Sequence, residues 1–250
     1  MLTFPLSKIN LGLNIIRRRP DGYHDIQSIM IPIGWSDILE IVPSAGKGTT
    51  LTVTGRPVCC PVEKNLVMKA LRAVESVAGQ LPPVDIFLRK IVPDGAGLGG
   101  GSADAAATVR LLNELFKLGL TDRDMSGICS TIGADCPFFI YNRPMAATGT
   151  GTDLSPIDVS GLKGLSIVVT KPDVSISTAE AYSGIIPSET EWNLRQLASS
   201  DRNLWKSRFV NHFEKPMAAT HPVIAELIEN FYRQGACFAA MSGSGSAVFG

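Results

Sequence analysis

The sequence has few of the residues on which metal centres and disulfide frameworks depend. Its three histidines are scattered at positions 24, 212 and 221, so their spacing indicates no His-based metal cluster. Its five cysteines are odd in number, include the adjacent pair Cys59 and Cys60, and form no Cys-x-x-Cys pattern. Neither a disulfide framework nor a zinc site is therefore indicated, and a reducing compartment fits best.

An excess of charge of one sign is also absent. Lys and Arg together number 23, and so do Asp and Glu. This balance provides no electrostatic footprint for a nucleic-acid backbone or an acidic membrane. No apolar run reaches membrane-spanning length, and residues 1–8 lack the pattern of a secretory leader. We expect a cytoplasmic protein with small-molecule ligands and no nucleic-acid or membrane partner, and the oligomeric state stays open.

What the sequence does have is an ordinary globular composition and one dense motif. With 250 residues, of which 45% are hydrophobic and 18% charged, the chain is long enough to bury one large core or two modest ones. The motif spans residues 93–107 and reads Pro-Asp-Gly-Ala-Gly-Leu-Gly-Gly-Gly-Ser-Ala-Asp-Ala-Ala-Ala. Residues 87–92 before it have a strand pattern, and a helix follows for which Ser102 is the expected cap.

A strand, a glycine loop and a helix together form a phosphate-binding layout. The unpaired amides and the dipole of the first helical turn attract anions, and glycine lets the backbone approach oxygen atoms closely. A mobile linker is the alternative, but linkers rarely abut a clean helix start. Gly95, Gly97 and Gly100 match G-x-G-x-x-G, yet residues 116–120 end a helix where a dinucleotide fold needs a second strand and an acidic residue. No lysine precedes Ser102, which excludes a Walker loop, so a third kind of nucleotide loop is needed.

The N-terminal residues predict a hairpin. Residues 8–15 alternate strictly, which puts Lys8 and Asn10 on one face, and a solvated face is the usual fate of a lysine. Pro-Asp-Gly within residues 17–24 predicts a turn into a second strand at residues 26–33. Three arginines in this stretch could serve solubility alone.

Further elements follow from periodicity and capping signals. We predict strands at residues 38–42, 50–53 and 165–170, a helix from Asn65 to Gly79, and a helix over 222–234 closed by Gly235. Thr121 and Asp124 form a capping box. Asp135 follows in Gly-Ala-Asp-Cys-Pro, where a loop or cap residue is as plausible as a catalytic base. Residues 239–250 hold a second glycine loop, Met-Ser-Gly-Ser-Gly-Ser, which a hairpin turn alone would explain.

The three motifs in this order resemble those of the GHMP superfamily of small-molecule kinases. The triple glycine before the serine and the Arg-x-Asp-Gly-Tyr-His pattern are most similar to the 4-diphosphocytidyl-2-C-methyl-D-erythritol kinases. The resemblance implies an α+β, two-domain fold with the chemistry between the domains. Residues 1–158 would form an N-terminal α/β domain with the glycine-rich phosphate loop, and residues 159–250 a ferredoxin-like C-terminal domain that stops short of the family's usual end.

The resemblance also implies the roles of individual residues. Asp135 would be the catalytic carboxylate and Lys8 the neutraliser of developing charge. The substrate would be bound by Asn10, Tyr23, His24, Thr178 and Tyr182, with the two tyrosines stacking on a cytosine and His24 bonding its edge. The ATP-binding residues would be Asn65, Pro93, Gly95, Ala96, Gly97, Leu98, Gly99, Gly100, Gly101, Ser102, Ala103, Gly243 and Ser244.

For several of these residues an ordinary structural role remains an alternative. Asn65 is also an expected N-cap, and Tyr182 could be an amphipathic helix residue with its hydroxyl in water. Ser102 would stand near Mg²⁺, while Asp104 would point away from the phosphates or act through the metal. His212 stands where the family's Asn-Asp-Phe/Leu-Glu pattern has an aspartate, which leaves the role of that position open.

The reaction implied is transfer of the ATP γ-phosphoryl group to the tertiary 2-hydroxyl of 4-diphosphocytidyl-2-C-methyl-D-erythritol, a step of non-mevalonate isoprenoid precursor synthesis. Three alternatives stay open from the sequence. A sister GHMP kinase acting on mevalonate, homoserine or a sugar would share Lys8 and Asp135 but has no need of Tyr23 and His24. A dinucleotide-dependent oxidoreductase rests on the glycine pattern alone, and a non-catalytic module would bind ATP without turnover.

Overall fold

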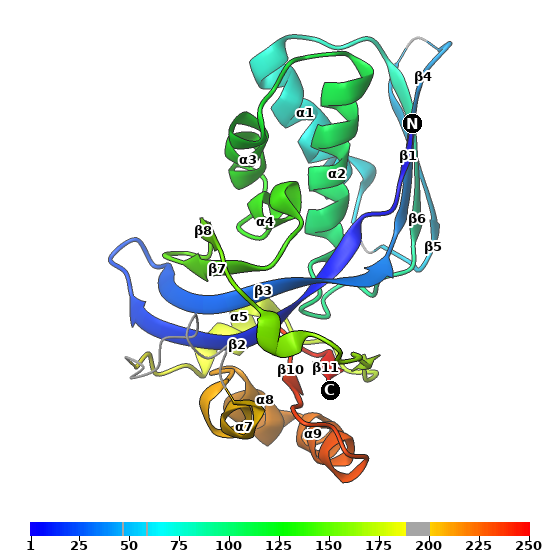
Figure 1. Cartoon of the computed structure of the whole chain (residues 1–250). Helices are drawn as coiled ribbons and strands as arrows, with labels where there is room; N and C mark the ends of the chain where they lie inside the picture. Colours follow the sequence, from blue (N-terminus) through cyan, green and yellow to red (C-terminus); the bar gives the residue numbers. More distant parts are fainter. Residues whose placement is uncertain (47, 59, 189–200) are drawn as a thin grey trace. The chain divides into compact units, whose positions relative to one another are not determined.

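The chain forms two compact units, each assembled from separate stretches of sequence. The computed structural model describes residues 1–46, 48–58, 60–188 and 201–250 (Figure 1). Unit 1 comprises Met1–Lys8, Pro32–Asp94 and Gly99–Arg143, and unit 2 comprises Ile9–Ile31, Gly95–Leu98 and Pro144–Gly250. The glycine loop therefore contributes backbone to both units. The division into domains 1–158 and 159–250 stays a prediction.

Unit 1 is a four-stranded sheet with helices on one face. The strands are ordered β1 (Leu2–Thr3), β4 (Ile38–Pro43), β6 (Val84–Lys90) and β5 (Thr50–Gly55), with β5 parallel to β6 and the other pairs antiparallel. Figure 1 shows the helices covering one side of this sheet: α1 (Leu66–Ala78), α2 (Gly100–Leu115), α3 (Asp122–Ser130) and α4 (Cys136–Tyr141). The short helix η1 (Val62–Lys64) precedes α1. The strands predicted at 38–42 and 50–53 are confirmed.

Local capping signals predicted both ends of α1 and the start of α3 in unit 1. The Asn65 side chain accepts a hydrogen bond from the Val67 amide, and Gly79 ends α1. The capping box of Thr121 and Asp124 is present at the start of α3. The expected strand at 87–92 instead covers Val84–Lys90, because the next two amides bind the Asp37 carboxylate and leave the sheet.

The predicted N-cap of α2 was wrong by three residues. The helix begins at Gly100, its N-cap is Gly99, and no side chain caps it. Gly99 adopts the left-handed conformation with φ +70°, and its carbonyl accepts the Ala103 amide at 2.9 Å. Glycine adopts this conformation at no steric cost. Ser102 therefore lies within the first helical turn, where its hydroxyl has no capping role.

Unit 2 contains most of a second sheet and all of a third. The strands β2 (Leu6–Arg18), β3 (His24–Ser36), β7 (Met145–Thr148) and β8 (Asp153–Pro156) are paired in that order. The turn predicted between β2 and β3 is confirmed by the bond from the Gly22 amide to the Arg19 carbonyl. The third sheet has the order β10 (Ala240–Met241), β11 (Val248–Phe249) and β9 (Val169–Thr170), all antiparallel. The strand predicted at 165–170 is thus only two residues long, because β11 pairs with it at two positions.

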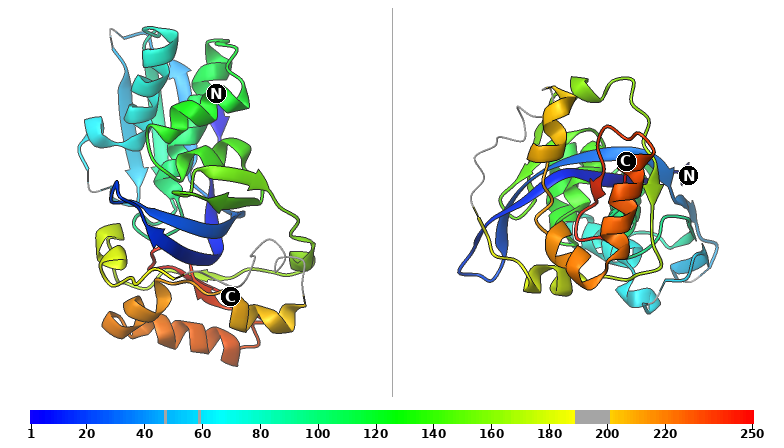
Figure 2. Two further views of the ribbon diagram at one scale, coloured as in Figure 1. Left: turned by 90° about the vertical axis from the view of Figure 1, so that its left-hand side faces the viewer. Right: turned by 90° about the horizontal axis from the view of Figure 1, so that it is seen from below.

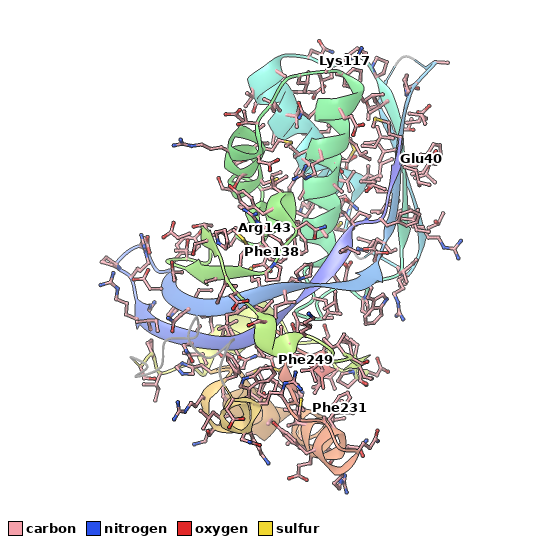
Figure 3. The ribbon with its side chains drawn as sticks, viewed as in Figure 1. Glu40, Lys117, Phe138, Arg143, Phe231 and Phe249 are labelled. Atoms are coloured by element: carbon pink, nitrogen blue, oxygen red, sulfur yellow. The ribbon has the colours of Figure 1, made fainter. Side chains whose placement is uncertain are left out.

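Unit 2 also contains helices, the last of which packs on the small sheet. They are α5 (Thr178–Ser183), α7 (Trp205–Arg208), α8 (Glu214–Thr220) and α9 (Val223–Arg233), with short turns at η2 (Ser160–Leu162) and η3 (Arg202–Leu204). Figure 2 shows α9 beside β10 and β11, and Figure 3 labels Phe231 on α9 and Phe249 on β11. The helix lies so close to the end of β11 that a Cβ at Gly250 would stand 2.6 Å from the Phe231 ring. The hydrophobic core of unit 2 includes Leu13, Ile15, Ile176, Phe213, Met217, Ile224, Met241 and Val248.

Within the described ranges, no helix has both the length and the apolar character needed to cross a membrane.

Candidate active site

A lysine and an aspartate that are far apart in the sequence meet in unit 1. The Lys8 ammonium lies 3.4 Å from the Asp135 carboxylate. Lys8 lies on β2 with its side chain only 4% exposed, so the solvated strand face that the alternation allowed does not form. Asp135 directly precedes α4, and its side chain is 35% exposed and makes no capping hydrogen bond. A buried cation is thus paired with a carboxylate that remains accessible to a ligand.

The start of helix α2 lies against this pair. A Cβ at Gly99 would stand 2.8 Å from the Phe139 ring and 3.2 Å from the Lys8 Cε. Both side chains are buried, so neither has room to move aside. Gly99 therefore needs to be glycine for two reasons, its left-handed backbone and the close approach of Lys8. The end of the glycine loop therefore packs directly against Lys8, the basic member of the Lys8–Asp135 pair.

A buried thiol, that of Cys136, lies beside Asp135 and Ser102, and a second, that of Cys129, lies near Cys136. Burial raises the pKa of the Cys136 thiol to about 11, against a hydrogen bond with Ser102, and burial raises the pKa of Cys129 to about 12. Both thiols are therefore protonated at neutral pH and poor nucleophiles. The four cysteines at described positions, 60, 129, 136 and 237, are all free. The Ser102 hydroxyl thus lies next to the residue that follows Asp135.

A buried charge cluster flanks the other side of the helix start. Asp104 points to Lys90, with 2.8 Å between its Oδ2 and the Lys90 ammonium, and Lys90 also pairs with Asp37. Burial opposes the charge on Lys90, but its two carboxylate partners hold the pKa of the ammonium above its ordinary value. Burial raises the pKa of the Asp104 carboxyl to about 7, against the pull of Lys90. The Asp104 carboxylate is thus paired with Lys90, and its position relative to the phosphates stays a prediction.

A pocket of about 230 Å³ adjoins this cluster. Its walls include Asn65, Leu66, Leu88, Gly101 and Asp104. The Asp104 Oδ1 atom is buried and has no hydrogen-bond partner among the described residues. A larger cavity of about 520 Å³ is lined by residues 3–6, one side of α2 and Phe139, but it includes neither Lys8 nor Asp135. Two of the predicted ATP-binding residues, Asn65 and Gly101, line the smaller pocket, and one, Ala103, lines the larger cavity.

In unit 2 the two glycine loops are in direct contact. Gly97 has φ +73°, and a Cβ there would stand 1.9 Å from the Ser242 carbonyl oxygen. The Ser242 hydroxyl donates to the Gly97 carbonyl at 2.9 Å and accepts the Asn10 amide at 3.3 Å. The Asn10 side chain donates to Ser28 at 2.8 Å, and a Cβ at Gly243 would stand 3.3 Å from the Asn10 Oδ1. Asn10, Gly97 and Gly243 are thus brought together.

The sequence did not identify Ser242 or Asn211 as site residues. Asn211 is buried, and its amide donates to the carbonyls of Met241 and Gly243, each at 2.8 Å. Its place in the Asn-His-Phe-Glu segment was the available signal. His212 accepts the Ile15 amide at 3.1 Å through Nδ1, and burial lowers the pKa of this imidazole, which favours the neutral acceptor. The second glycine loop is therefore hydrogen-bonded to the Asn211 side chain as well as to the Asn10 backbone.

An aromatic pair lies elsewhere in unit 2. The rings of His24 and Tyr182 are stacked with centroids 4.8 Å apart, and Tyr182 also contacts the Phe213 ring edge to face. The Tyr23 side chain is 67% exposed, and Thr178 is exposed at the first residue of α5. His24, rather than Tyr23, therefore faces the Tyr182 ring. Bonds from Arg17 and Arg19 to Asp25, which lower the pKa of that carboxyl, brace the hairpin.

Comparison with known proteins identifies the family. The family model described as GHMP kinases N terminal domain matches residues 65–143, and the one described as GHMP kinases C terminal matches residues 191–250. Proteins named 4-diphosphocytidyl-2-C-methyl-D-erythritol kinase are similar over the whole chain. The one from Parabacteroides distasonis is 50% identical over 250 residues, and the one from Bacteroides fragilis is 47% identical over 252. Each alignment covers 100% of this chain and 91% of the relative.

Solved structures show the same relationship. A crystal structure of 4-(cytidine 5'-diphospho)-2C-methyl-D-erythritol kinase superposes with a TM-score of 0.83 at 30% identity, covering 100% of this chain and 89% of the other. Homoserine kinase from Cytophaga hutchinsonii shares the fold, with a TM-score of 0.73 at 20% identity over 98% of this chain and 84% of its own. These relatives are kinases, so the G-x-G-x-x-G match does not indicate an oxidoreductase. The chain belongs to the GHMP kinase family and, within it, to the 4-diphosphocytidyl-2-C-methyl-D-erythritol kinases.

Proposed function

We propose that this protein transfers the γ-phosphoryl group of ATP to the 2-hydroxyl of 4-diphosphocytidyl-2-C-methyl-D-erythritol, with Lys8 and Asp135 as the catalytic pair. ATP-dependent phosphorylation of a small molecule is the activity of its family. The observation that carries the assignment of residues is the 3.4 Å pair of Lys8 and Asp135 against Gly99. The reaction belongs to non-mevalonate isoprenoid precursor synthesis, and we expect it to take place in the cytoplasm.

The acceptor alcohol is a poor nucleophile, which determines what the pair has to do. A tertiary hydroxyl is hindered and has a high pKa, and the transition state of phosphoryl transfer is loose. Alignment and charge neutralisation therefore contribute more than complete deprotonation beforehand. Asp135, whose carboxylate is partly exposed, accepts the proton of the hydroxyl. Lys8 lies beside it and neutralises the negative charge that develops.

The nucleotide is held by backbone rather than by long side chains. The amides of residues 95–102 bind the β- and γ-phosphate oxygens, and the first turn of α2 adds its dipole. Gly243 and Ser244, on the second glycine loop, cover the phosphates. The 230 Å³ pocket at Asn65 and Gly101 takes the nucleoside. Its apolar walls, Leu66 and Leu88, suit a purine face.

The chain also offers ligands suited to Mg²⁺. Magnesium prefers oxygen ligands and in kinases is bound through one or two protein groups together with substrate phosphates. The Ser102 hydroxyl in the first turn of α2 is an oxygen donor of this kind, whereas Asp104 is committed to Lys90. The described residues contain no cluster of three or more His, Cys, Asp or Glu, which is compatible with a metal held mainly by phosphate oxygens. When bound, the metal would neutralise phosphate charge.

The cytidine end of the acceptor binds in unit 2. A pyrimidine requires an aromatic face and a hydrogen-bonding group at its edge. Tyr182 provides the face, and His24 provides the hydrogen-bond donor or acceptor. We infer that the base stacks on the face of the Tyr182 ring against which the His24 ring now lies. Tyr23, exposed beside them, is free to close on the other face of the base. Asn10 and Thr178 bind the remaining substrate groups.

A coupled ATPase assay with purified protein tests the proposal. Turnover is expected with 4-diphosphocytidyl-2-C-methyl-D-erythritol and not with mevalonate or homoserine. Asp135→Asn should lower kcat by about a hundredfold or more while ATP binding survives, since general-base groups contribute on that order. Asp122→Asn, which alters an exposed pair with Arg110 on the same unit, is the control. A folded Asp135→Asn protein that turns over near the parent rate would remove Asp135 from the mechanism, and turnover with another acceptor would change the substrate.

A further inference from the structure

Asp37 is a fully buried carboxylate outside the predicted site. It lies between β3 and β4 and is 0% exposed. One of its oxygens accepts the amides of Ile91 and Val92, the latter at 2.8 Å, and the other accepts the Lys90 ammonium. These are the last residues before Pro93, where the glycine loop begins. Asp37 therefore determines where β6 ends and in which direction the chain leaves it.

The contacts continue from Asp37 to the other end of the loop. Lys90 donates to Asp104 at 2.8 Å, and Asp104 lies just after the first turn of α2. Gly100, the first residue of α2, packs on the same groups, because a Cβ there would stand 3.0 Å from Val92 Cγ1 and 3.4 Å from the Lys90 ammonium. Asp37, Lys90 and Asp104 thus connect the two ends of the loop of residues 93–99. Asp37 binds the backbone before the loop, and Asp104 lies in the helix after it. We call these three residues the loop clamp.

Burial of the loop clamp carries a large unfavourable desolvation free energy. All three side chains are at most 3% exposed, and transferring charges out of water costs several kcal/mol for each ion. Buried ion clusters can often be replaced by apolar side chains without loss of stability. A network of this kind is therefore weak evidence of a stabilising role, and its effect on position is the more specific consequence.

We propose that Asp37 is a positioning residue for the phosphates of ATP, acting through the backbone at 91–92 and, through Lys90 and Asp104, on the first turns of α2. The proposal rests on the proposed function, because it assumes that the loop of residues 93–99 binds ATP. Asp37 does not line the nucleotide pocket itself and touches no reacting group. Its loss should therefore weaken ATP binding while leaving the chemical step and the acceptor largely unaffected.

Asp37 can be replaced without leaving Lys90 unpaired. When the Asp37 carboxylate is removed, the Lys90 ammonium keeps Asp104 as a partner at 2.8 Å. Asp37→Asn keeps the size and one acceptor oxygen for the two backbone amides but loses the acceptor for Lys90. Asp37→Ala loses both. The two variants thus separate the link to Lys90 from the capping of residues 91 and 92.

The matched control is Asp85→Asn. Asp85 lies at the opposite end of the same strand, β6, where it accepts a hydrogen bond from Thr50 at 2.7 Å. For each protein we would measure Tm, kcat, the KM for ATP and the KM for the acceptor. The KM for ATP should rise about threefold in Asp37→Asn and about tenfold or more in Asp37→Ala, because two buried amides lose their acceptor only in the second. In both Asp37 variants the values of kcat and of the acceptor KM should change by less than twofold. Asp85→Asn should leave kcat and both KM values unchanged.

Several outcomes would overturn the proposal. If the KM for ATP is unchanged in Asp37→Asn while Tm falls, Asp37 only stabilises the fold. If kcat falls and the KM for ATP does not, the residue acts on the chemical step instead. Should Asp37→Ala fail to fold, the isosteric Asn variant still decides. A parent protein that neither binds ATP nor phosphorylates the acceptor would instead refute the proposed function, and that result is distinct from a parent that works and a variant that is unaffected.

Discussion

Replacing Gly97 by alanine tests whether the two glycine loops are built to touch. Gly97 and Gly95 belong to the same loop and both have a left-handed backbone, with φ of +73° and +60°. An alanine in this conformation costs about 1–2 kcal/mol at either position. The surroundings differ, because a Cβ at Gly95 meets nothing closer than 4.0 Å, whereas a Cβ at Gly97 would lie 1.9 Å from the Ser242 carbonyl oxygen. Gly95→Ala is thus a control with the same backbone penalty and no clash.

The size of the clash sets the expected difference. Cβ atoms essentially never approach a neighbour within 3.0 Å, so the Ser242 carbonyl would have to move by at least 3.0 minus 1.9, or 1.1 Å. Such a shift breaks the 2.9 Å bond from the Ser242 hydroxyl to the Gly97 carbonyl and strains the bonds from Asn211 to Met241 and Gly243. At about 1 kcal/mol for each hydrogen bond, Gly97→Ala should cost roughly 2 kcal/mol more than Gly95→Ala.

Urea unfolding followed by circular dichroism measures this difference directly, with the slope of the transition checked for two-state behaviour. A 2 kcal/mol gap corresponds to a Tm difference of about 4–8 °C for a chain of this length. Ser242→Ala provides a second control, because it removes the hydroxyl but leaves the carbonyl that clashes, so it should not rescue Gly97→Ala. Equal stability of the Gly95→Ala and Gly97→Ala proteins would refute the inference that the loops are in contact.

The remaining predictions concern the clamp and the aromatic pair. Burial raises the pKa of the Asp104 carboxyl from 3.8 to about 7, so the folded state holds this proton more tightly than the unfolded state. The stabilising contribution is therefore fully present below about pH 4 and is lost as the pH rises to about 7. Asp104→Asn should flatten this dependence in denaturation curves taken between pH 4 and 8, and an unchanged profile would assign the effect to other groups. Tyr182→Ala should raise the KM for the acceptor about tenfold with little change for ATP, whereas Tyr182→Phe, which keeps the ring, should stay near the parent, and equal effects of the two variants would exclude stacking.

Features that depend on neighbours in the sequence were predictable. The caps at Asn65 and at Thr121 and the turn after Arg19 need only a few adjacent residues, and each is present. The start of α2 was misplaced because a serine is a good cap by propensity, while Gly99, a left-handed glycine three residues earlier, is the N-cap with which the helix begins. Propensity therefore gave the helix but not its first residue.

Contacts between residues far apart in the sequence were only partly predictable from it. In β6 the alternation places Lys90 on the same face as the buried Ile86 and Leu88, so a charged core residue could have been suspected. Its partners could not, because Asp37 is 53 residues away from it. In the same way Ser242 meets Asn10 across 232 residues, and nothing local in either segment indicates that contact.

The sequence by itself indicated the family, because the motifs that resemble it depend on residue types at fixed short spacings. Through that resemblance it also gave the kind of nucleotide loop and the pair of residues expected to do the chemistry. The tertiary structure decided that Lys8 is buried rather than solvated, that it meets Asp135 beside Gly99, and that His24 rather than Tyr23 faces the Tyr182 ring. The physical reason is that burial, close approach and stacking are properties of segments brought together from distant parts of the chain, and no short stretch of sequence specifies its own surroundings.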